Sequence, residues 1–415
     1  MASLPWRGAP PPGPPRIETA AHGAGALSAG TAAVPIALPP GVPIGGFARL
    51  SYRSEPPAEP LLARAVVLSE PGCAVALVSL EILLVPEALD RLVRERVADL
   101  GLDGVVVAAT HTHAGPGGFW DSLAGERLAT GPFDPAAREA LVGAAAQAIR
   151  RAAHARIPAE LSISLGRAEA LAANRNGGAV DARLVLARLR RLDGHPLADV
   201  VVFPAHPTLL GKRNRRLSGD WPGALMYDER AAEGARAMGV RLFFQGAVGD
   251  QSARQPPGGS SPGSYARAVE AAIAAVRSAA DGESAPRLGY AAATVPLPAV
   301  DPGAVPALLR PAARNALGGG LPSSARVQAI RLGPAMLLAV PGEPVADVGA
   351  EWRAAAGGGA EVLSLAGGYV GYVETPGRVR AGSGETRRTY YGPGLADRLG
   401  AALVAAARAA DAGAR

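Results

Sequence analysis

Cysteine, lysine and aromatic residues are scarce in this chain of 415 residues. Cys73 is the only cysteine, so the chain cannot form an internal disulfide. The lone thiol also excludes a cluster of thiolate ligands, so any bound metal must be held by histidine, carboxylate or tyrosine oxygen. Six histidines are present, and two of them, His111 and His113, stand close together. We therefore look for chemistry first around this pair.

Long apolar runs are also missing, although hydrophobic residues make up 48% of the chain. No stretch free of charge, proline and clustered glycine reaches the roughly 18 residues that a membrane-spanning helix requires. The N-terminal region is rich in proline, glycine and alanine, and it lacks the apolar segment of a secretory signal. We therefore expect a soluble, cytoplasmic protein with an irregular leader over residues 1–28.

Positive charge comes almost entirely from arginine, because Lys212 is the only lysine while the net charge is +6. The arginines are scattered, and the one dense basic cluster, Lys212–Arg216, contains no aromatic residue. This pattern fits no nucleic-acid motif, so we expect no nucleic-acid partner. The cluster is either a solvated loop or a loop that meets an acidic or phosphate-bearing surface.

Apolar segments of strand length alternate with alanine-rich segments of helical length, which favours an α/β architecture. The expected strands are Ala63–Leu68, Ala74–Leu80, Val105–Ala109, Leu161–Leu165, Leu184–Leu189, Asp199–Phe203, Val240–Phe244, Leu288–Val295, Val327–Leu332, Ala335–Val340 and Val362–Leu365. The expected helices are Pro86–Asp99, Pro135–Ala155, Gly223–Met238, Ser264–Ala280, Val345–Ala356 and Leu395–Ala410. Short turns with Asp, Gly or Pro join the strands on either side of residues 190–198 and 333–334, which indicates two antiparallel hairpins. The sheet is therefore expected to be mixed.

The most informative segment lies directly behind the expected strand Val105–Ala109. It reads Thr-His-Thr-His-Ala-Gly-Pro-Gly-Gly over residues 110–118. Side chains repeat every two residues in an extended chain, so we expect His111 and His113 on one side of it. Two adjacent imidazoles are typical of a metal site or of acid/base chemistry.

Residues of unusual type also follow four other expected strands. They are His206–Pro207, Gly249–Ser252, Gly342–Glu343 and Gly368–Tyr372. Active sites gather at strand ends in α/β sheets, because loops can converge there while the strands hold them rigid. Each of these motifs alone is more typical of an ordinary turn or of packing. Together with the histidine pair, they predict a single cleft.

In their order along the chain, these motifs resemble those of the neutral/alkaline non-lysosomal ceramidase family. The matching segments are His111–Gly118, Asn174–Arg175, His206–Pro207, Ser218–Asp220, Gly249–Ser252, Pro341–Glu343, Tyr369–Tyr372 and Tyr391–Pro393. The resemblance implies a single ceramidase-like catalytic domain over residues 29–415, with mixed β-sheets flanked by helices. The chain also differs from the family pattern, because no segment matches the C-terminal immunoglobulin-like domain of the family.

The resemblance implies a zinc-dependent amidohydrolase that cleaves the N-acyl amide bond of a ceramide-like or other N-acyl substrate by zinc-activated water. By the family pattern, Zn²⁺ would be held by His111, His206, Glu343 and Tyr372. A set of nitrogen and oxygen donors with an open position suits a catalytic zinc ion. A lipid amide as substrate would also bring the protein into peripheral contact with a membrane.

Three further residues match catalytic positions of the family. His113 matches the residue that transfers a proton, and Arg175 matches an arginine that contacts substrate. Ser252 matches a serine that acts as a nucleophile or positions the substrate. No base is evident beside Ser252 in the sequence, which favours activated water over an acyl-enzyme.

The chain departs from the family pattern around the substrate pocket. A second catalytic tyrosine of the family falls on Gly384, so its oxyanion donor is either missing or replaced by Tyr369, Tyr390 or another group. The Asn-Arg motif is followed by the short segment Asn176–Gly178 instead of a long Ser-Pro segment. Two alternatives stay open for this reason. One is a metal-dependent esterase or phosphoesterase, and the other is a non-catalytic zinc-containing relative that binds lipid or peptide.

Overall fold

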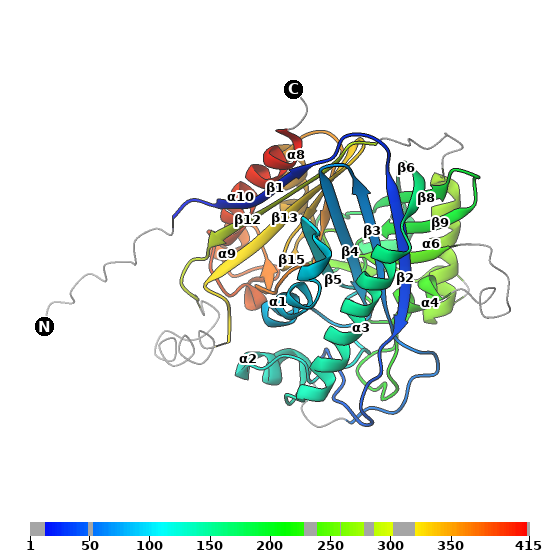
Figure 1. Ribbon diagram of the computed structural model, residues 1–415. Coiled ribbons are helices and arrows are strands. Elements are labelled where there is room, and N and C mark those ends of the chain that lie inside the picture. Colours follow the sequence, from blue (N-terminus) through cyan, green and yellow to red (C-terminus); the bar gives the residue numbers. More distant parts are fainter. Residues whose placement is uncertain are drawn as a thin grey trace, which may run out of the picture.

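The computed structural model describes residues 13–48, 53–227, 239–257, 259–277, 286–301 and 320–412. Its longer strands are β1 (Arg16–His22), β2 (Ser28–Pro35), β3 (Leu62–Glu70), β4 (Cys73–Leu80), β5 (Gly104–Ala109), β6 (Ile157–Arg167), β8 (Arg183–Arg191), β9 (Pro196–Val202), β10 (Val240–Phe244), β12 (Leu288–Pro296), β13 (Ser324–Leu332), β14 (Ala335–Ala339) and β16 (Ala360–Leu363). Its short strands are β7 (Ala172–Asn174), β11 (Gln251–Ala253), β15 (Glu343–Pro344) and β17 (Tyr372–Val373). Its helices are α1 (Glu87–Arg96), α2 (Leu123–Gly125), α3 (Pro135–His154), α4 (Asp220–Met226), α6 (Pro262–Val276), α8 (Ala346–Ala356), α9 (Pro376–Ala381) and α10 (Leu395–Asp411) (Figure 1).

Two mixed sheets form the centre of the protein. The larger sheet has eight strands in the order β10-β9-β8-β6-β2-β3-β4-β5, and the smaller has five in the order β1-β12-β13-β14-β16. Parallel pairs occur between β9 and β10, between β4 and β5, and between β14 and β16, whereas the other neighbours are antiparallel. The expected hairpins are confirmed as β8-β9 and β13-β14.

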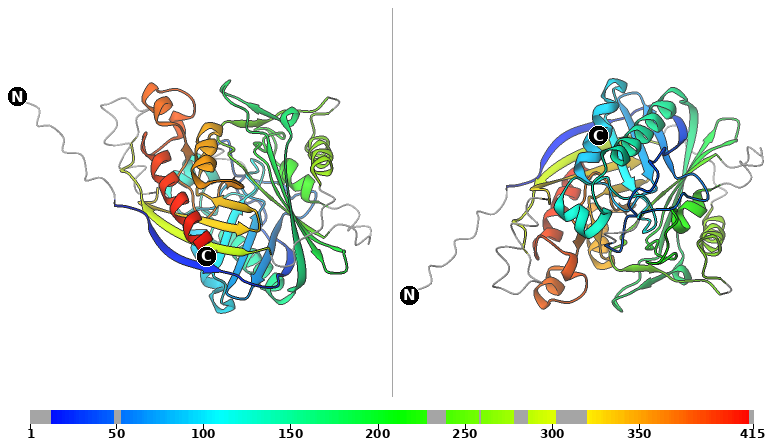
Figure 2. Two further views of the ribbon diagram at one scale, coloured as in Figure 1. Left: turned by 90° about the horizontal axis from the view of Figure 1, so that it is seen from above. Right: turned by 90° about the horizontal axis from the view of Figure 1, so that it is seen from below.

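The two sheets pack face to face because their strands carry apolar side chains on both faces. Val66 and Leu77 of the larger sheet share one buried cluster with Tyr290 and Ile330 of the smaller sheet. Helix α3 covers the outer face of β2 and β3, and α8 and α10 cover the outer face of the smaller sheet (Figure 1). Figure 2 shows α4 and α6 lying against the other end of the larger sheet. The strand ends that carry the site are therefore held between layers of rigid elements.

Helix α3 lies unusually close to the sheet because small residues face each other there. Asp134 caps its first turn by accepting from the N–H groups of Ala136 and Ala137, and Pro135 occupies the first position. A Cβ atom on Gly30 of β2 would fall 2.1 Å from the Ala152 carbonyl oxygen. Only glycine permits this approach.

The α/β class with mixed sheets and flanking helices is confirmed, and each of the expected strands overlaps a strand of the structure. The expected helices near residues 86–99, 135–155, 345–356 and 395–410 correspond to α1, α3, α8 and α10. The other two begin as α4 and α6, but residues 228–238 and 278–280 lie outside the described residues.

The expectation of an irregular leader over residues 1–28 is wrong where the structure describes it. Arg16–His22 forms β1, which pairs antiparallel with β12 at the edge of the smaller sheet, and β2 begins at Ser28. Most side chains of β1 are exposed or half-buried. Backbone hydrogen bonds rather than an apolar pattern hold this strand, so its sequence carried little signal. Residues 1–12 lie outside the described residues.

None of the helices in the described part of the chain combines the length and the apolar character that crossing a bilayer would demand.

Candidate metal centre and active site

His111 is the first candidate ligand behind β5. Its backbone is left-handed, with φ of 72°, and its N–H donates to the Ile82 carbonyl over 3.0 Å. Its ring Nδ1 lies 2.7 Å from the carbonyl oxygen of Leu83. Because a carbonyl can only accept a hydrogen bond, Nδ1 carries the proton and Nε2 keeps a free lone pair. This lone pair is the atom that a metal would use.

The His-x-His segment is not the extended chain that its spacing predicted, because the backbone of His111 is left-handed. β5 ends at Ala109 and the backbone of His111 is left-handed, yet the rings of His111 and His113 lie with centroids 4.9 Å apart. Thr112 turns away between them, and its hydroxyl donates to the Ser218 carbonyl over 2.8 Å. A Cβ on Gly46 would fall 2.7 Å from His113 Nδ1, so glycine makes room for this ring. The two imidazoles therefore meet as predicted, but for a different geometric reason.

His206 joins them from the segment that follows β9. Its backbone bridges to Ser252, and its ring Nδ1 lies 2.8 Å from the Gln251 carbonyl oxygen. By the same argument as for His111, its Nε2 keeps the lone pair that a metal would use, and Arg175 Nη1 lies 3.4 Å from that atom. The ring centroids of His111 and His206 are 4.7 Å apart.

Glu343 and Tyr372 complete the cluster from β15 and β17, whose parallel pairing sets the two residues opposite each other. Glu343 Oε2 lies 3.1 Å from His111 Nε2 and 3.3 Å from His206 Nε2. The Tyr372 hydroxyl lies 3.2 Å from His206 Nε2. The four ligands that the resemblance implies thus lie together, each 7% exposed or less.

The donor atoms of this cluster fit a small divalent metal. His111 Nε2, both ring nitrogens of His113 and Glu343 Oε2 are buried without a hydrogen-bond partner among the described residues. Buried polar atoms are normally paired, so converging unpaired donors indicate a ligand site. Tetrahedral Zn²⁺ with bonds of about 2.0–2.1 Å separates its donors by about 3.3 Å. The observed separations of 3.1, 3.2 and 3.3 Å agree with that spacing.

A second donor set is present in the same place. The ring nitrogens of His111, His113 and His206 lie within 4.8 Å of one another. This spacing is wider than a tetrahedral zinc site needs, whereas Glu343 lies closer to both His111 and His206. The geometry therefore favours the set that contains the carboxylate.

Burial and neighbouring charges hold these groups in the forms that bind a metal cation. Burial lowers the pKa of His206 to about 4 and lowers the pKa of His113 well below its usual range, so both rings are neutral. Burial raises the pKa of Glu343, but its contacts with His111 and His206 lower that pKa well below its usual range, because a cation held at this place, whether a proton on one of the rings or a metal ion, stabilises the carboxylate. Neutral imidazoles and an ionised carboxylate are metal ligands.

Arg175 reaches the cluster from the residue that follows β7. Its Nη1 lies 3.3 Å from His206 Nδ1, and its Nη2 donates to the Gly249 carbonyl. Its Nε donates to the carboxylate of Glu385 over 2.7 Å. Sequence reasoning missed Glu385, because a single glutamate in a loop carries no signal until its partner is known.

Ser252 lies half-buried on β11, opposite Ala173 of β7. Asp250 stabilises the segment that leads into β11, since its carboxylate accepts from the Ala346 N–H over 2.9 Å and from Asn174 Nδ2 over 2.7 Å. Neither ring nitrogen of His113 has a hydrogen-bond partner within the described part of the chain. Ser252 and His113 therefore do not form the hydrogen-bonded pair that an activated serine nucleophile needs.

A family model described as neutral/alkaline non-lysosomal ceramidase, N-terminal, matches residues 39–293. The chain belongs to this family. Among curated proteins it is similar to the neutral ceramidase of Mycobacterium tuberculosis, with 31% identity over 239 residues. That match covers 50% of this chain and 37% of the mycobacterial protein, so the matched segment spans well under half of that relative.

Solved ceramidase structures share the fold of this family member. The crystal structure of neutral ceramidase from Pseudomonas aeruginosa matches with a TM-score of 0.83 at 19% identity, covering 92% of this chain and 74% of that one. A second structure, described as ceramidase complexed with C2, matches with a TM-score of 0.80 at 18% identity, covering 92% and 75%. The ceramidase-like fold expected from the sequence is confirmed.

Gly384, where the resemblance places a family tyrosine, is a strained and crowded position for a side chain in this ceramidase-family protein. Its φ is +60°, and a Cβ there would fall 2.2 Å from Glu374 Oε2. Glu374 is buried and accepts from the Glu385 N–H over 3.0 Å. Tyr369 and Tyr390, the alternatives considered, both lie half-buried against the core near the cluster.

Gly384→Ala is expected to destabilise the protein more than Gly382→Ala. Both positions are left-handed, which costs about 1–2 kcal/mol for a residue with a side chain, but Gly382 has nothing within 4 Å of its added Cβ. The contact with Glu374 adds about 1–3 kcal/mol at Gly384. Free energies of unfolding from urea titrations measure the difference. Equal losses in the two variants would contradict the steric argument.

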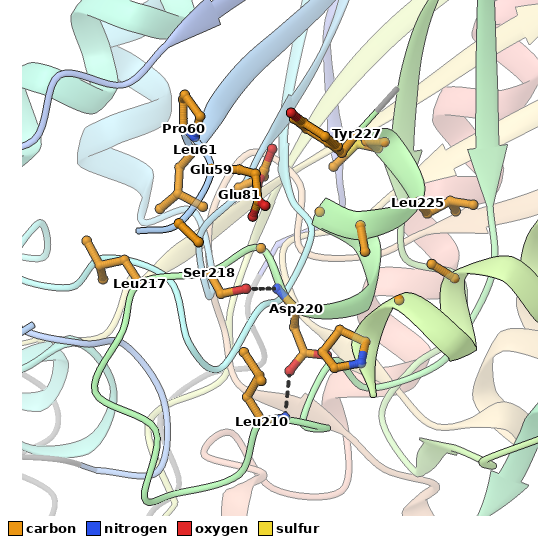
Figure 3. Close-up of a pocket in the computed structure, with 18 of the residues that line it drawn as sticks. Glu59, Pro60, Leu61, Glu81, Leu210, Leu217, Ser218, Asp220, Leu225 and Tyr227 are labelled. Atoms are coloured by element: carbon orange, nitrogen blue, oxygen red, sulfur yellow. Dashed lines mark hydrogen bonds between the residues drawn. The ribbon is translucent and has the colours of Figure 1, made fainter. Parts of the chain in front are cut away.

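A separate pocket of about 710 Å³ has Leu61, Glu81 and Tyr227 among its lining residues (Figure 3). The Ser218–Asp220 motif lines it, with the Asp220 N–H donating to the Ser218 hydroxyl over 3.0 Å. A buried ion pair between Arg64 and Glu81 forms part of its lining. A Cβ on Gly219 would fall 2.3 Å from Glu81 Oε2. Because the Ser218 carbonyl also accepts from the Thr112 hydroxyl, this motif is linked directly to the His-x-His segment.

Proposed function

We propose that this protein is a Zn²⁺-dependent amidohydrolase that cleaves the N-acyl amide bond of a ceramide-like or other N-acyl substrate. The observation that supports it most is that Glu343 Oε2 lies 3.1 Å from His111 Nε2 and 3.3 Å from His206 Nε2, while it is buried without a hydrogen-bond partner among the described residues. Membership of the ceramidase family supports the reaction class.

In this proposal His111, His206, Glu343 and Tyr372 hold the metal. A zinc ion there supplies a Lewis acid that polarises a carbonyl oxygen and lowers the pKa of water. The backbone carbonyls of Leu83 and Gln251 orient the two imidazoles, so that neither ring must reorganise to bind.

His113 is proposed to move the proton. It is neutral because burial lowers its pKa, and both of its ring nitrogens are unpartnered among the described residues. It would accept a proton from the attacking water at a ring nitrogen and then deliver that proton to the leaving amine nitrogen. The C–N bond breaks in that second step, which releases the amine and the fatty acid.

Arg175 and Ser252 are proposed to position the substrate. Arg175 lies beside His206, where its guanidinium stabilises negative charge that develops on the carbonyl oxygen. Ser252 stands next to His206 on the paired backbone, and its hydroxyl can donate to a polar group of the substrate.

Tyr369→Phe is expected to weaken metal binding about 10- to 100-fold. The Tyr369 hydroxyl donates to Glu343 Oε1 over 2.7 Å and so fixes the carboxylate, and loss of such an outer partner has this effect on metal affinity. Competition with a chromophoric chelator measures it. Tyr390→Phe is the matched control, because the structure gives Tyr390 no hydrogen bond to Glu343. Unchanged affinity in Tyr369→Phe would remove this residue from the metal site.

Metal analysis combined with a substrate panel tests the proposed function. We expect about one zinc ion per chain, hydrolysis of N-acyl amides detected as released fatty acid, loss of that activity with a chelator and recovery when zinc is returned. Turnover of only carboxylic esters or phosphoesters would assign the esterase alternative. Bound zinc without turnover of amide, ester or phosphoester would assign the non-catalytic alternative.

A further inference from the structure

The segment between Glu374 and Arg388 borders the cluster and carries an uneven distribution of charge. It includes α9 and holds two carboxylates and four guanidinium groups, at Glu374, Glu385, Arg378, Arg380, Arg387 and Arg388. Both glutamates are buried, whereas Arg380, Arg387 and Arg388 are exposed. The acids therefore point inward and the excess positive charge faces solvent.

Arg388 is the member of this segment that reaches the proposed metal site. Its guanidinium carbon lies 5.4 Å from the centroid of the Tyr372 ring. Its Nη1 donates to Glu385 Oε2 over 3.0 Å, and its side chain is 60% exposed. Its Nε and Nη2 donate to no other residue in the described part of the chain, so they are open to a ligand.

Arg175 does not offer its Nε and Nη2 to a ligand as Arg388 does. Its guanidinium carbon lies 5.5 Å from the Tyr372 ring centroid, but its Nε donates to Glu385 and its Nη2 to the Gly249 carbonyl. The carboxylate of Glu385 thus bridges two guanidinium groups and neutralises only one of their two charges. One net positive charge remains beside the cluster, on the exposed side.

We propose that Arg388 binds an anionic group on the substrate, close to the scissile amide, so that the preferred substrates are N-acyl amides whose amine part carries a carboxylate or sulfonate. This inference rests on the proposed function and names its substrate class. A guanidinium binds a carboxylate through charge-assisted hydrogen bonds. A neutral hydroxyl in the same place forms weaker hydrogen bonds, which compensate less for the hydration that the guanidinium loses on binding. The position of Arg388 against Tyr372, which is only 7% exposed, favours the substrate itself over an anionic membrane surface.

Two short soluble substrates test this proposal. N-octanoylglycine and N-octanoylethanolamine have the same acyl chain and differ mainly in a carboxylate against a hydroxyl group. We expect kcat/KM of the wild type to favour N-octanoylglycine, and we expect Arg388→Gln to lower that preference by about tenfold, which is the effect of one hydrogen bond to a charged group. N-octanoyltaurine extends the comparison to a sulfonate.

Arg387→Gln is the matched control, because it removes the same charge from the adjacent exposed residue. The proposal requires the preference to be kept in Arg387→Gln and reduced in Arg388→Gln. Equal effects of the two substitutions, or equal rates on the two substrates in the wild type, would overturn it. A preference that appears only when phosphatidylglycerol vesicles are added would assign the charge to a membrane surface and would also overturn it.

Calorimetric binding separates this inference from the proposed function. If neither substrate is hydrolysed, the function fails, but N-octanoylglycine should still bind the wild type more tightly than N-octanoylethanolamine and more tightly than it binds Arg388→Gln. Equal binding in these comparisons would overturn the inference. Thermal midpoints of both variants verify that the fold is kept.

Discussion

His206→Ala is expected to leave the purified protein without bound zinc and to lower kcat/KM for an N-acyl amide by about a thousandfold or more. The imidazole contributes one of the converging donors, with its Nε2 3.3 Å from Glu343 Oε2 and 3.2 Å from the Tyr372 hydroxyl. Lewis-acid stabilisation by a metal is worth several kcal/mol in the transition state, and each 1.4 kcal/mol or so is a factor of ten in rate. Zinc content by mass spectrometry and initial rates of fatty acid release measure the two effects.

The exposed His195, in the turn between β8 and β9, provides the control for this substitution. His195→Ala removes an imidazole far from the cluster and should keep both the zinc and the activity. Full zinc content in His206→Ala would mean that the ion, if bound, lies elsewhere, and the proposed ligand set would be wrong.

His113→Gln is expected to keep the zinc and to lower kcat by about 10²- to 10⁴-fold, which is the usual contribution of a general acid or base. Glutamine has similar length and polar atoms but cannot exchange a proton near neutral pH. The buried ring of His113 has no hydrogen-bond partner among the described residues, so its removal breaks no network. Metal content shows whether the zinc is kept, and single-turnover rates measure the loss of proton transfer.

Two other results for His113→Gln would change the role assigned to His113. Loss of zinc in this variant would favour the set of three imidazoles, because His113 lies within 4.8 Å of the other two rings. Activity close to that of the wild type would show that another group moves the proton.

Periodicity and composition predicted the α/β class and the long strands well. Strands such as Val240–Phe244 are continuous apolar runs that end at turn residues, and the structure confirms that strand with the same bounds. β1 and β2 were missed because most of their side chains are not fully buried, so their pairing with β12 and β3 defines them. The short strands β15 and β17 were missed as well, since two residues carry no period.

The candidate site was predictable as a set of residue types at strand ends, but its geometry was not. The spacing of His111 and His113 suggested an extended chain, whereas a left-handed backbone at His111 produces the contact. The partners that fix the imidazoles are backbone carbonyls of Leu83 and Gln251, and every residue carries a carbonyl. Glu385 and Arg388 likewise gain significance only from their neighbours in space.

By itself the sequence determined which residues are candidates for chemistry: a chain with one cysteine leaves imidazole, carboxylate and phenol as candidate ligands, and it carries them behind apolar strands in the order typical of its family. Only the tertiary structure decided which of these side chains meet, which nitrogen of each imidazole keeps its lone pair, and where positive charge remains in excess beside the cluster. The reason is physical. Local sequence sets the strand and its end, but the separation between strand ends far apart in the chain depends on how two sheets and their covering helices pack.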